Sequence, residues 1–212
     1  MKPLKLALGI LLILSFCLPA ALSAADTKGT LTCVGLYSET SDGNISYRVG
    51  KANWVVIKVG DVIPAAAEVR INVDRDWIEL IATSNPNKVF DLSGPDTGEV
   101  VLKVADILKG KSRTVAFPKK GAATDPAFKD KLVVSQVWGR QVYRANPDTP
   151  DKDIQYGDLL DIKGKVRIIG INNTLNLTFP NGAVTTIVGP LNFEVQKVFA
   201  GSNLYKYLNV AK

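Results

Sequence analysis

Apolar and polar residues alternate along much of this chain with a period of two. The pattern is clearest in segments 55–59, 69–74 and 175–179, where every second residue is Val, Ile, Leu or Phe. Successive side chains of a β-strand point to opposite faces, so this pattern predicts strands that each bury one face.

Turn-forming residues separate these strand segments. They are Ser41-Asp42-Gly43-Asn44, Asn85-Pro86-Asn87, Pro180-Asn181-Gly182 and the Gly-Pro pairs at 94 and 189. An Asn-Gly pair accepts the positive φ angles of a tight turn, so Asn181-Gly182 predicts a hairpin.

Helix is favoured in two segments. In the first, 96–109, residues 100–102 are typical of a strand and residues 105–108 of a helical turn, so we expect a strand followed by a short helical turn. The second is the C-terminal tail at 202–210, where Leu204, Tyr207 and Leu208 are the apolar residues.

The strand pattern occurs twice. Gly60-Asp61 recurs as Gly157-Asp158, and Val69-Arg70-Ile71 recurs as Val166-Arg167-Ile168, in both cases 97 residues later. Gly-Asp is turn chemistry, in which the carboxylate accepts bonds from nearby backbone amides, so we expect Asp61 and Asp158 to form turns.

The spacing of the two copies then shortens to 95 residues, between Gly94-Pro95 and Gly189-Pro190. We place the difference in the loop near residues 85 and 182, and on the same spacing Glu99-Val100 aligns with Glu194-Val195. A length change confined to a loop, with the strands kept in register, indicates a duplicated β unit.

These patterns predict an all-β fold of two tandem, small sandwich-like or roll-like domains with at most short helical turns. The first repeat spans 26–108 and the second 131–200, with a linker at 109–130 and a C-terminal tail at 201–212. Units of this size bury too little surface to be very stable alone, so we expect the copies to pack together. The basic cluster of the linker, 109–113 with Lys119 and Lys120, is expected to be solvated.

Residues 1–25 have the features of a secretory signal. Lys2 and Lys5 precede an apolar run at 6–18, and small residues near Ala24 and Ala25 suit cleavage there. We therefore expect a bacterial protein that is periplasmic or secreted, with no membrane-spanning segment after cleavage. The processed chain keeps Cys33 alone, which is expected to be a core residue or to pair between chains.

The chemistry available to an enzyme is limited. The chain has no His, which removes the usual general base and the commonest ligand of transition metals. Three aspartates at 148, 151 and 153 lack the Gly and the distal Glu of a calcium loop, so a solvated loop is expected. We predict a protein without catalytic residues, metal or cofactor; the alternative is a carboxylate-dependent hydrolase of envelope glycan.

The charge is mildly basic. The formal net charge of +6 falls to +4 when Lys2 and Lys5 are removed, since 24 basic residues then face 20 acidic ones. An acidic envelope glycan is a candidate partner for such a chain, whereas export disfavours nucleic acid.

The repeat resembles the FecR-like domain family. The first copy carries Val59-Gly60-Asp61, Val69-Arg70 and Ile78-Glu79-Leu80; the second carries Gly157-Asp158, Gly164, Val166-Arg167, Leu175-Asn176-Leu177 and Asn181-Gly182. The first copy departs from the pattern at Ala67 and at Asn85-Pro86-Asn87. The resemblance implies an exported β module. The best-known members of the family signal to a sigma factor, but residues 1–5 are too short to form the cytoplasmic docking segment, so no direct contact with a sigma factor is expected.

Five residues are candidates for binding: Arg70, Arg167, Trp77, Trp138 and Tyr143. The arginines are expected to point outward from their strands, either paired across strands or on a ligand. Trp77 lies opposite Ile78 and Leu80, and is a sugar-stacking or partner-anchoring candidate only if nothing covers its face. The sequence therefore predicts a non-catalytic cell-envelope protein that binds an envelope protein or peptidoglycan, with a secreted adhesin or accessory subunit as the alternative.

Overall fold

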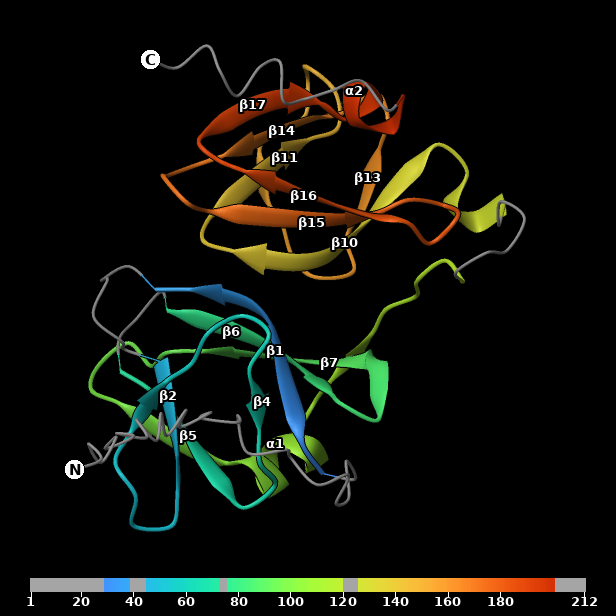
Figure 1. The fold of residues 1–212 in the computed structure, drawn as a ribbon. Helices are drawn as coiled ribbons and strands as arrows, with labels where there is room; N and C mark the ends of the chain where they lie inside the picture. Colours follow the sequence, from blue (N-terminus) through green and yellow to red (C-terminus); the bar gives the residue numbers. More distant parts are fainter. Residues whose placement is uncertain (1–28, 39–44, 73–75, 120–125, 201–212) are drawn as a thin grey trace, which may run out of the picture.

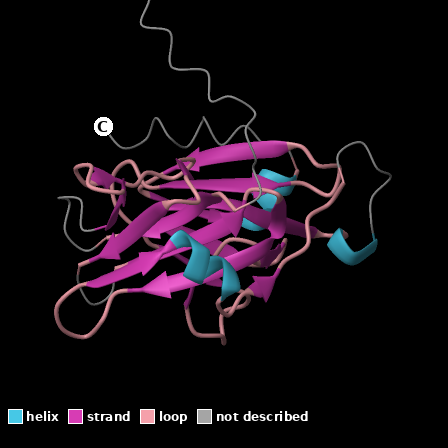
Figure 2. Ribbon diagram, turned by 90° about the horizontal axis from the view of Figure 1, so that it is seen from below, coloured by secondary structure: helices cyan, strands magenta, loops and turns pink. Residues whose placement is uncertain are grey.

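The computed structural model describes residues 29–38, 45–72, 76–119 and 126–200 (Figure 1). Strands make up about half of this part of the chain and the helical segments are few and short (Figure 2), which confirms the all-β prediction. The signal at 1–25, the turn at 41–44 and the tail at 201–212 lie outside the described residues.

The elements of the two repeats follow each other in the same order. Those of the first repeat are β1 (Leu31–Tyr37), β2 (Ile45–Val49), β3 (Val55–Val56), β4 (Val62–Ile63), β5 (Ala67–Ile71), β6 (Trp77–Ala82), β7 (Asn85–Ser93), β8 (Val100–Lys103) and α1 (Val104–Lys109). Those of the second are β10 (Lys131–Trp138), β11 (Gln141–Arg144), β12 (Lys152–Asp153), β13 (Leu159–Asp161), β14 (Lys165–Ile168), β15 (Thr174–Thr178), β16 (Val184–Val188), β17 (Leu191–Glu194) and α2 (Val195–Phe199). Between them lie β9 (Arg113–Thr114) and the 3₁₀ turn η1 (Pro126–Phe128).

Strand pairing is the same in both repeats. In the first, β1 pairs with β4 and β6, β6 with β7, β2 with β3 and β5, and β5 with β8. The corresponding strands β10 to β17 make the same pairs. A register shift recurs as well. It lies between Cys33 and Gly35 where β1 pairs with β6, and between Val134 and Gln136 where β10 pairs with β15.

The two halves are joined through one sheet. β1 and β10 pair in parallel, with Gly35 opposite Val137 and Leu36 opposite Trp138. This pair lies at the centre of a nine-stranded sheet whose main path runs β16-β15-β10-β1-β6-β7-β9. The repeats are therefore equivalent units within one continuous sheet, and each half of that sheet packs on its own four-stranded sheet (Figure 1).

The two hydrophobic cores lie on opposite faces of the shared sheet. Directly paired residues point to the same face, so Leu36 and its neighbour Trp138 share one face, and Gly35 and Val137 share the other. Leu36 belongs to the core of the first repeat, whereas Val137 belongs to the core of the second. Cys33 is fully buried in the first core, as expected of a core residue, and burial raises the pKa of its thiol far above the ordinary value.

The short helix after residues 100–102 is confirmed as α1, which buries Val104 and Ile107. Its counterpart α2 buries Val195 and Val198 and was not predicted. The expected turn at 85–87 is wrong, because β7 already begins at Asn85.

The sequence alignment is wrong beyond the Gly-Pro pairs. Val69 pairs with Leu102 in the first repeat, and its equivalent Val166 pairs with Phe193, so Leu102 corresponds to Phe193. The spacing there is 91 residues (193 minus 102), four fewer than between the Gly-Pro pairs. Val195 therefore matches Val104 at the start of the helix rather than Val100, because the first repeat has a longer loop before β8.

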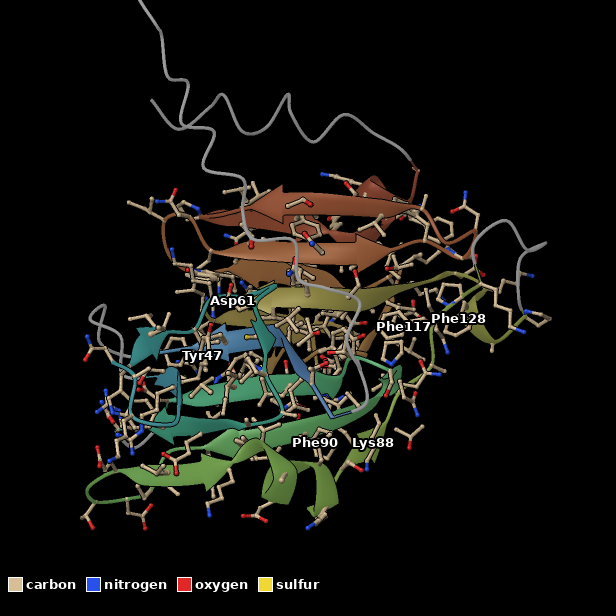
Figure 3. The ribbon with its side chains drawn as sticks, turned by 60° about the horizontal axis from the view of Figure 1, so that its bottom comes forward. Tyr47, Asp61, Lys88, Phe90, Phe117 and Phe128 are labelled. Carbon is tan, nitrogen blue, oxygen red and sulfur yellow. The ribbon has the colours of Figure 1, made fainter. Side chains whose placement is uncertain are left out.

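The linker is partly built into the fold. β9 pairs with β7, and Val115 and Tyr156 pack with Val34, Ile81 and Val89 in a small third cluster. Phe117, labelled in Figure 3, packs against this cluster with its ring 5.0 Å from that of Tyr156. The expectation of a solvated linker is wrong at Arg113, which forms ion pairs with Glu79 and Asp91.

Within the described residues, no helix has the length and apolar character needed to cross a membrane.

Candidate functional site

The outer face of the sheet β12-β11-β14-β17 carries a row of charged side chains. Alternation along the strands buries Val166, Ile168 and Phe193 against the core. It leaves polar residues on the other side, and they come from β11, β14 and β17: Arg144, Lys165, Arg167, Asn192 and Glu194. We call this surface the basic sheet face.

A shallow, open pocket of about 380 Å³ lies on the basic sheet face. Asp151, from the loop before β12, and Lys197, from α2, complete its polar lining. Four cationic side chains and two carboxylates thus surround the pocket, an excess of two positive charges. Because the cations project from paired strands and a packed helix, their positions are fixed by the fold rather than by a free loop.

Asp151 bridges two arginines in this pocket. Arg144 donates from Nε to Oδ1 of Asp151 at 2.7 Å, and Arg167 donates from Nη2 to Oδ2 at 2.9 Å. The two guanidinium groups are about half exposed, at 47% and 54%. Exposed ion pairs of this kind contribute about 0–1 kcal/mol each, so they position the loop more than they stabilise the fold.

The equivalent position in the first repeat is occupied by Trp54. Val55 pairs with Tyr47, just as Lys152 pairs with Tyr143, so the residues before them, Trp54 and Asp151, correspond. Arg48 and Arg70 correspond in the same way to Arg144 and Arg167. Both repeats therefore keep the pair of arginines and differ in what the pair contacts.

Trp54 contacts both arginines through its ring. The guanidinium carbons of Arg48 and Arg70 each lie 4.4 Å from the centroid of the indole, a distance typical of cation–π contacts. Arg48 also pairs with Glu68 at 2.9 Å, and Arg70 donates to Ser46 Oγ at 3.2 Å. Arg70 and Arg167 thus point outward as predicted. Arg70 bonds across strands to Ser46, whereas the partner of Arg167 is Asp151 of the loop before β12.

Tyr143 lies beneath the basic sheet face rather than on it. Its ring packs against the core of the second repeat, and its hydroxyl accepts a bond from the backbone N–H of Asp161 at 3.0 Å. A Cβ at Gly164 would overlap the ring, so Gly164 leaves the space that Tyr143 fills. Burial raises the pKa of the phenol. The structure gives Tyr143 a packing role.

The two tryptophans proposed for binding lie at the junction of the repeats. Trp77 shares a strand face with Glu79, packs against the core of the second repeat and lies 6.3 Å from the ring of Tyr37. Trp138 neighbours Leu36 in the parallel pair of β1 and β10. Both side chains are half-buried, and neither lines the pocket. Of the two alternatives for Trp77, the structure favours the covered one.

The repeated aspartates form turns, as predicted. Asp61 accepts a bond from the N–H of Lys58 at 2.9 Å, and Asp158 accepts one from the N–H of Gln155 at 3.0 Å (Figure 3 labels Asp61). Gly60 and Gly157, which precede them, have φ angles of 97° and 81°, which favour glycine.

The acidic loop of the second repeat is compensated by arginines. Asp151 is held by Arg144 and Arg167, and Asp153 pairs with Arg140 at 3.0 Å. In the part of the chain that the structure describes, no three His, Cys, Asp or Glu side chains are grouped to hold a metal ion.

A buried carboxylate at the junction was missed by the sequence analysis. Glu79 is 2% exposed and accepts bonds from the N–H of Tyr156, at 3.0 Å to Oε2, and from Arg113 Nη2, at 2.5 Å to Oε1. Burial raises its pKa to about 7, although the Tyr156 N–H and Arg113 oppose the shift. A Cβ at Gly35 would overlap the carboxylate, so glycine there makes room for it. A lone acid in the apolar run of β6 was the available signal.

Arg144 was also missed, as was the role of Asp151, which was expected to lie in a solvated loop. The available signal was the Tyr-Arg pair at 47–48, which recurs at 143–144 in the equivalent strand.

Comparison with family models, with curated proteins and with solved structures gives no match. The FecR-like resemblance therefore stays a prediction, and the function has to be argued from the side chains described above.

Proposed function

We propose that this chain is a non-catalytic, exported binding protein of the bacterial cell envelope, and that the basic sheet face holds an acidic partner, the wall glycan first among them. Export rests on the signal pattern at 1–25. The observation that carries the binding proposal is the open pocket, in which four cations on a rigid sheet face outnumber two carboxylates. Such a surface attracts acidic polymers and loses its attraction as salt rises.

Binding suits this pocket better than catalysis. Its two carboxylates, Asp151 and Glu194, are paired with Arg144, Arg167 and Lys165. A carboxylate-dependent hydrolase needs carboxyl groups free to exchange protons with the substrate, whereas both of these are engaged by neighbouring cations. The pocket lining contains no Ser, Thr, Cys or Tyr that could act as a nucleophile. A carboxylate-dependent hydrolase is therefore the weaker proposal.

The FecR-like resemblance enters the proposal as an exported β module. The repeated strand pairings agree with a duplicated module of this kind. We do not extend the proposal to signalling.

The test is co-sedimentation of the purified protein with insoluble peptidoglycan at increasing salt. Lys165→Ala with Lys197→Ala removes two cations from the pocket and leaves the bridge from Asp151 to the arginines in place. The matched control is Lys58→Ala with Lys103→Ala in the first repeat. We expect retention of the wild type at low salt, a several-fold loss in the pocket variant and none in the control. No retention of the wild type, or equal loss in both variants, would remove the proposal. If the protein instead captures an acidic envelope protein through this pocket, the partner is that protein rather than the wall glycan.

A further inference from the structure

The shared sheet ends in an unusual edge strand. Every residue of β16 is β-branched, Val184-Thr185-Thr186-Ile187-Val188, and none is charged. Among the described strands, β16 pairs with β15 alone and forms one end of the main path of the nine-stranded sheet. Natural proteins protect such edges with charges, bulges or covering segments, because an open, neutral edge pairs with other strands.

The hydrogen bonds of the hairpin show which residues face the open edge. Phe179 N–H donates to the carbonyl of Ala183, and Gly189 N–H donates to that of Asn173, each at 2.8 Å. In an antiparallel pair such bonds occur at every second residue, so Thr185 and Ile187 bond to β15. Val184, Thr186 and Val188 therefore direct their N–H and C=O groups away from the sheet.

The equivalent edge in the first repeat is covered. β9 pairs with β7 at Lys88 and Val89, and Val115 N–H donates to the carbonyl of Asn87 at 2.9 Å. Lys88 lies 4.9 Å from the ring centroid of Phe90 and donates to the carbonyl of Leu108 (Figure 3). The covered edge shows that this position of the repeat accepts an added antiparallel strand.

The two edge strands also differ in charge. Ile78 pairs with Leu92 in the first repeat, and its equivalent Leu175 pairs with Ile187 in the second, so Leu92 corresponds to Ile187. On this register Asp91 corresponds to Thr186. The first repeat thus has a carboxylate, paired with Arg113 at 2.7 Å, where the second has a neutral hydroxyl.

We infer that β16 is an interaction surface whose partner is a second copy of this chain, paired antiparallel across a two-fold axis at Thr186. The strand is self-complementary in this arrangement: Thr186 meets its own copy, Val184 meets Val188, and Thr185 meets Ile187. All three outward-facing residues exchange both backbone bonds with their partners. The exposed valines, at 59% and 39%, gain β-branched neighbours across the strands. A charge at position 186 would oppose this pairing, because equal charges would meet at the axis.

This site is separate from the pocket on the basic sheet face, since no residue of β16 lines it. Dimerisation through β16 would continue the shared sheet from one copy into the next. It would also give each assembly two basic sheet faces, which increases the retention of a polymer that offers many binding sites.

The experiment is sedimentation velocity of the purified protein from micromolar to near-millimolar concentration. Thr186→Lys and Thr186→Glu each place like charges at the axis, and a charge at this position is compatible with the fold because Asp91 occupies it in the first repeat. We expect a concentration-dependent dimer for the wild type and for the control Val101→Lys, on the exposed strand β8. Each Thr186 variant alone should remain monomeric, and their equimolar mixture should regain dimer.

Circular dichroism before and after mixing verifies that the Thr186 variants are folded. A monomeric wild type at every concentration would overturn the inference, as would a dimer that persists in both variants. Failure of the mixture to regain dimer, with both variants folded, would overturn the two-fold arrangement.

Discussion

Trp54 and Asp151 occupy the same position in the two repeats and contact the same pair of arginines. In the first repeat the indole ring lies 4.4 Å from each guanidinium carbon. In the second a carboxylate bridges the two groups at 2.7 and 2.9 Å. Duplication has thus kept the cations and exchanged their partner, so the two outer sheet faces differ in chemistry while sharing a backbone.

The first prediction concerns the carboxylate that partly neutralises the pocket. Asp151→Asn removes one negative charge from beside Arg144 and Arg167, so retention by wall glycan should rise. A charge of this exposure is worth about 0.5–1 kcal/mol, or roughly a two- to five-fold change in affinity. Co-sedimentation measures it. Asp148→Asn in the same loop is the control, and weaker retention by Asp151→Asn would contradict the proposed role of the face.

Trp77→Ala tests whether Trp77 packs or binds. Because the ring lies between the repeats, against the second core and near Tyr37, its removal should lower the free energy of unfolding by about 2–4 kcal/mol. Retention by wall glycan, measured on folded protein, should be unchanged. Normal stability with lost retention would show that the tryptophan contacts the ligand.

The stability of the fold should depend on the protonation of Glu79. Its pKa is raised to about 7 by burial, from 4.5. The folded state therefore binds this proton more tightly than the unfolded state. Protonation of Glu79 therefore adds to the free energy of unfolding, on the order of 3 kcal/mol in total. This contribution is fully present below about pH 4.5 and is lost as pH rises through about 7. Urea unfolding across this range should show a decline that Glu79→Gln flattens.

The control for that titration is Glu68→Gln, which changes a half-buried carboxylate paired with Arg48. It should keep the wild-type slope between pH 4.5 and pH 7. A Glu79→Gln variant with the full wild-type decline would mean that another group titrates in this range.

Gly35→Ala should destabilise the junction, because the added Cβ would overlap the carboxylate of Glu79. Overpacking of this kind costs about 1–3 kcal/mol, measurable by thermal unfolding. In a Glu79→Ala background the same change should cost clearly less, since the group that it meets is gone. Equal costs in both backgrounds would show that the two side chains do not compete for space.

The strands were predictable because their signal is local. Alternation in segments such as 69–74 and 175–179 needs only neighbouring residues, and burial of Val69, Ile71, Leu175 and Leu177 follows it. The hairpin at Asn181-Gly182 was predictable for the same reason, and Gly182 has a φ of 79°.

What the sequence could not predict depends on residues far apart. Glu79 meets Arg113 and Tyr156, which lie 34 and 77 positions away, and only the packing of the repeats brings them together. The alignment failed beyond Gly94-Pro95 because the length of an irregular loop leaves no periodic signal. The exposure of Trp77 depends on which part of the molecule covers its face of the strand, and the pattern of one strand carries no information about that.

The central claim, that the basic sheet face binds an acidic envelope ligand, is tested most directly by backbone amide NMR with soluble wall-glycan fragments. We expect salt-sensitive shifts that cluster on β11, β14 and β17, around Arg144, Lys165 and Arg167, with Arg48 and Arg70 unaffected. Shifts confined to other surfaces, or none at saturating fragment and low salt, would contradict it.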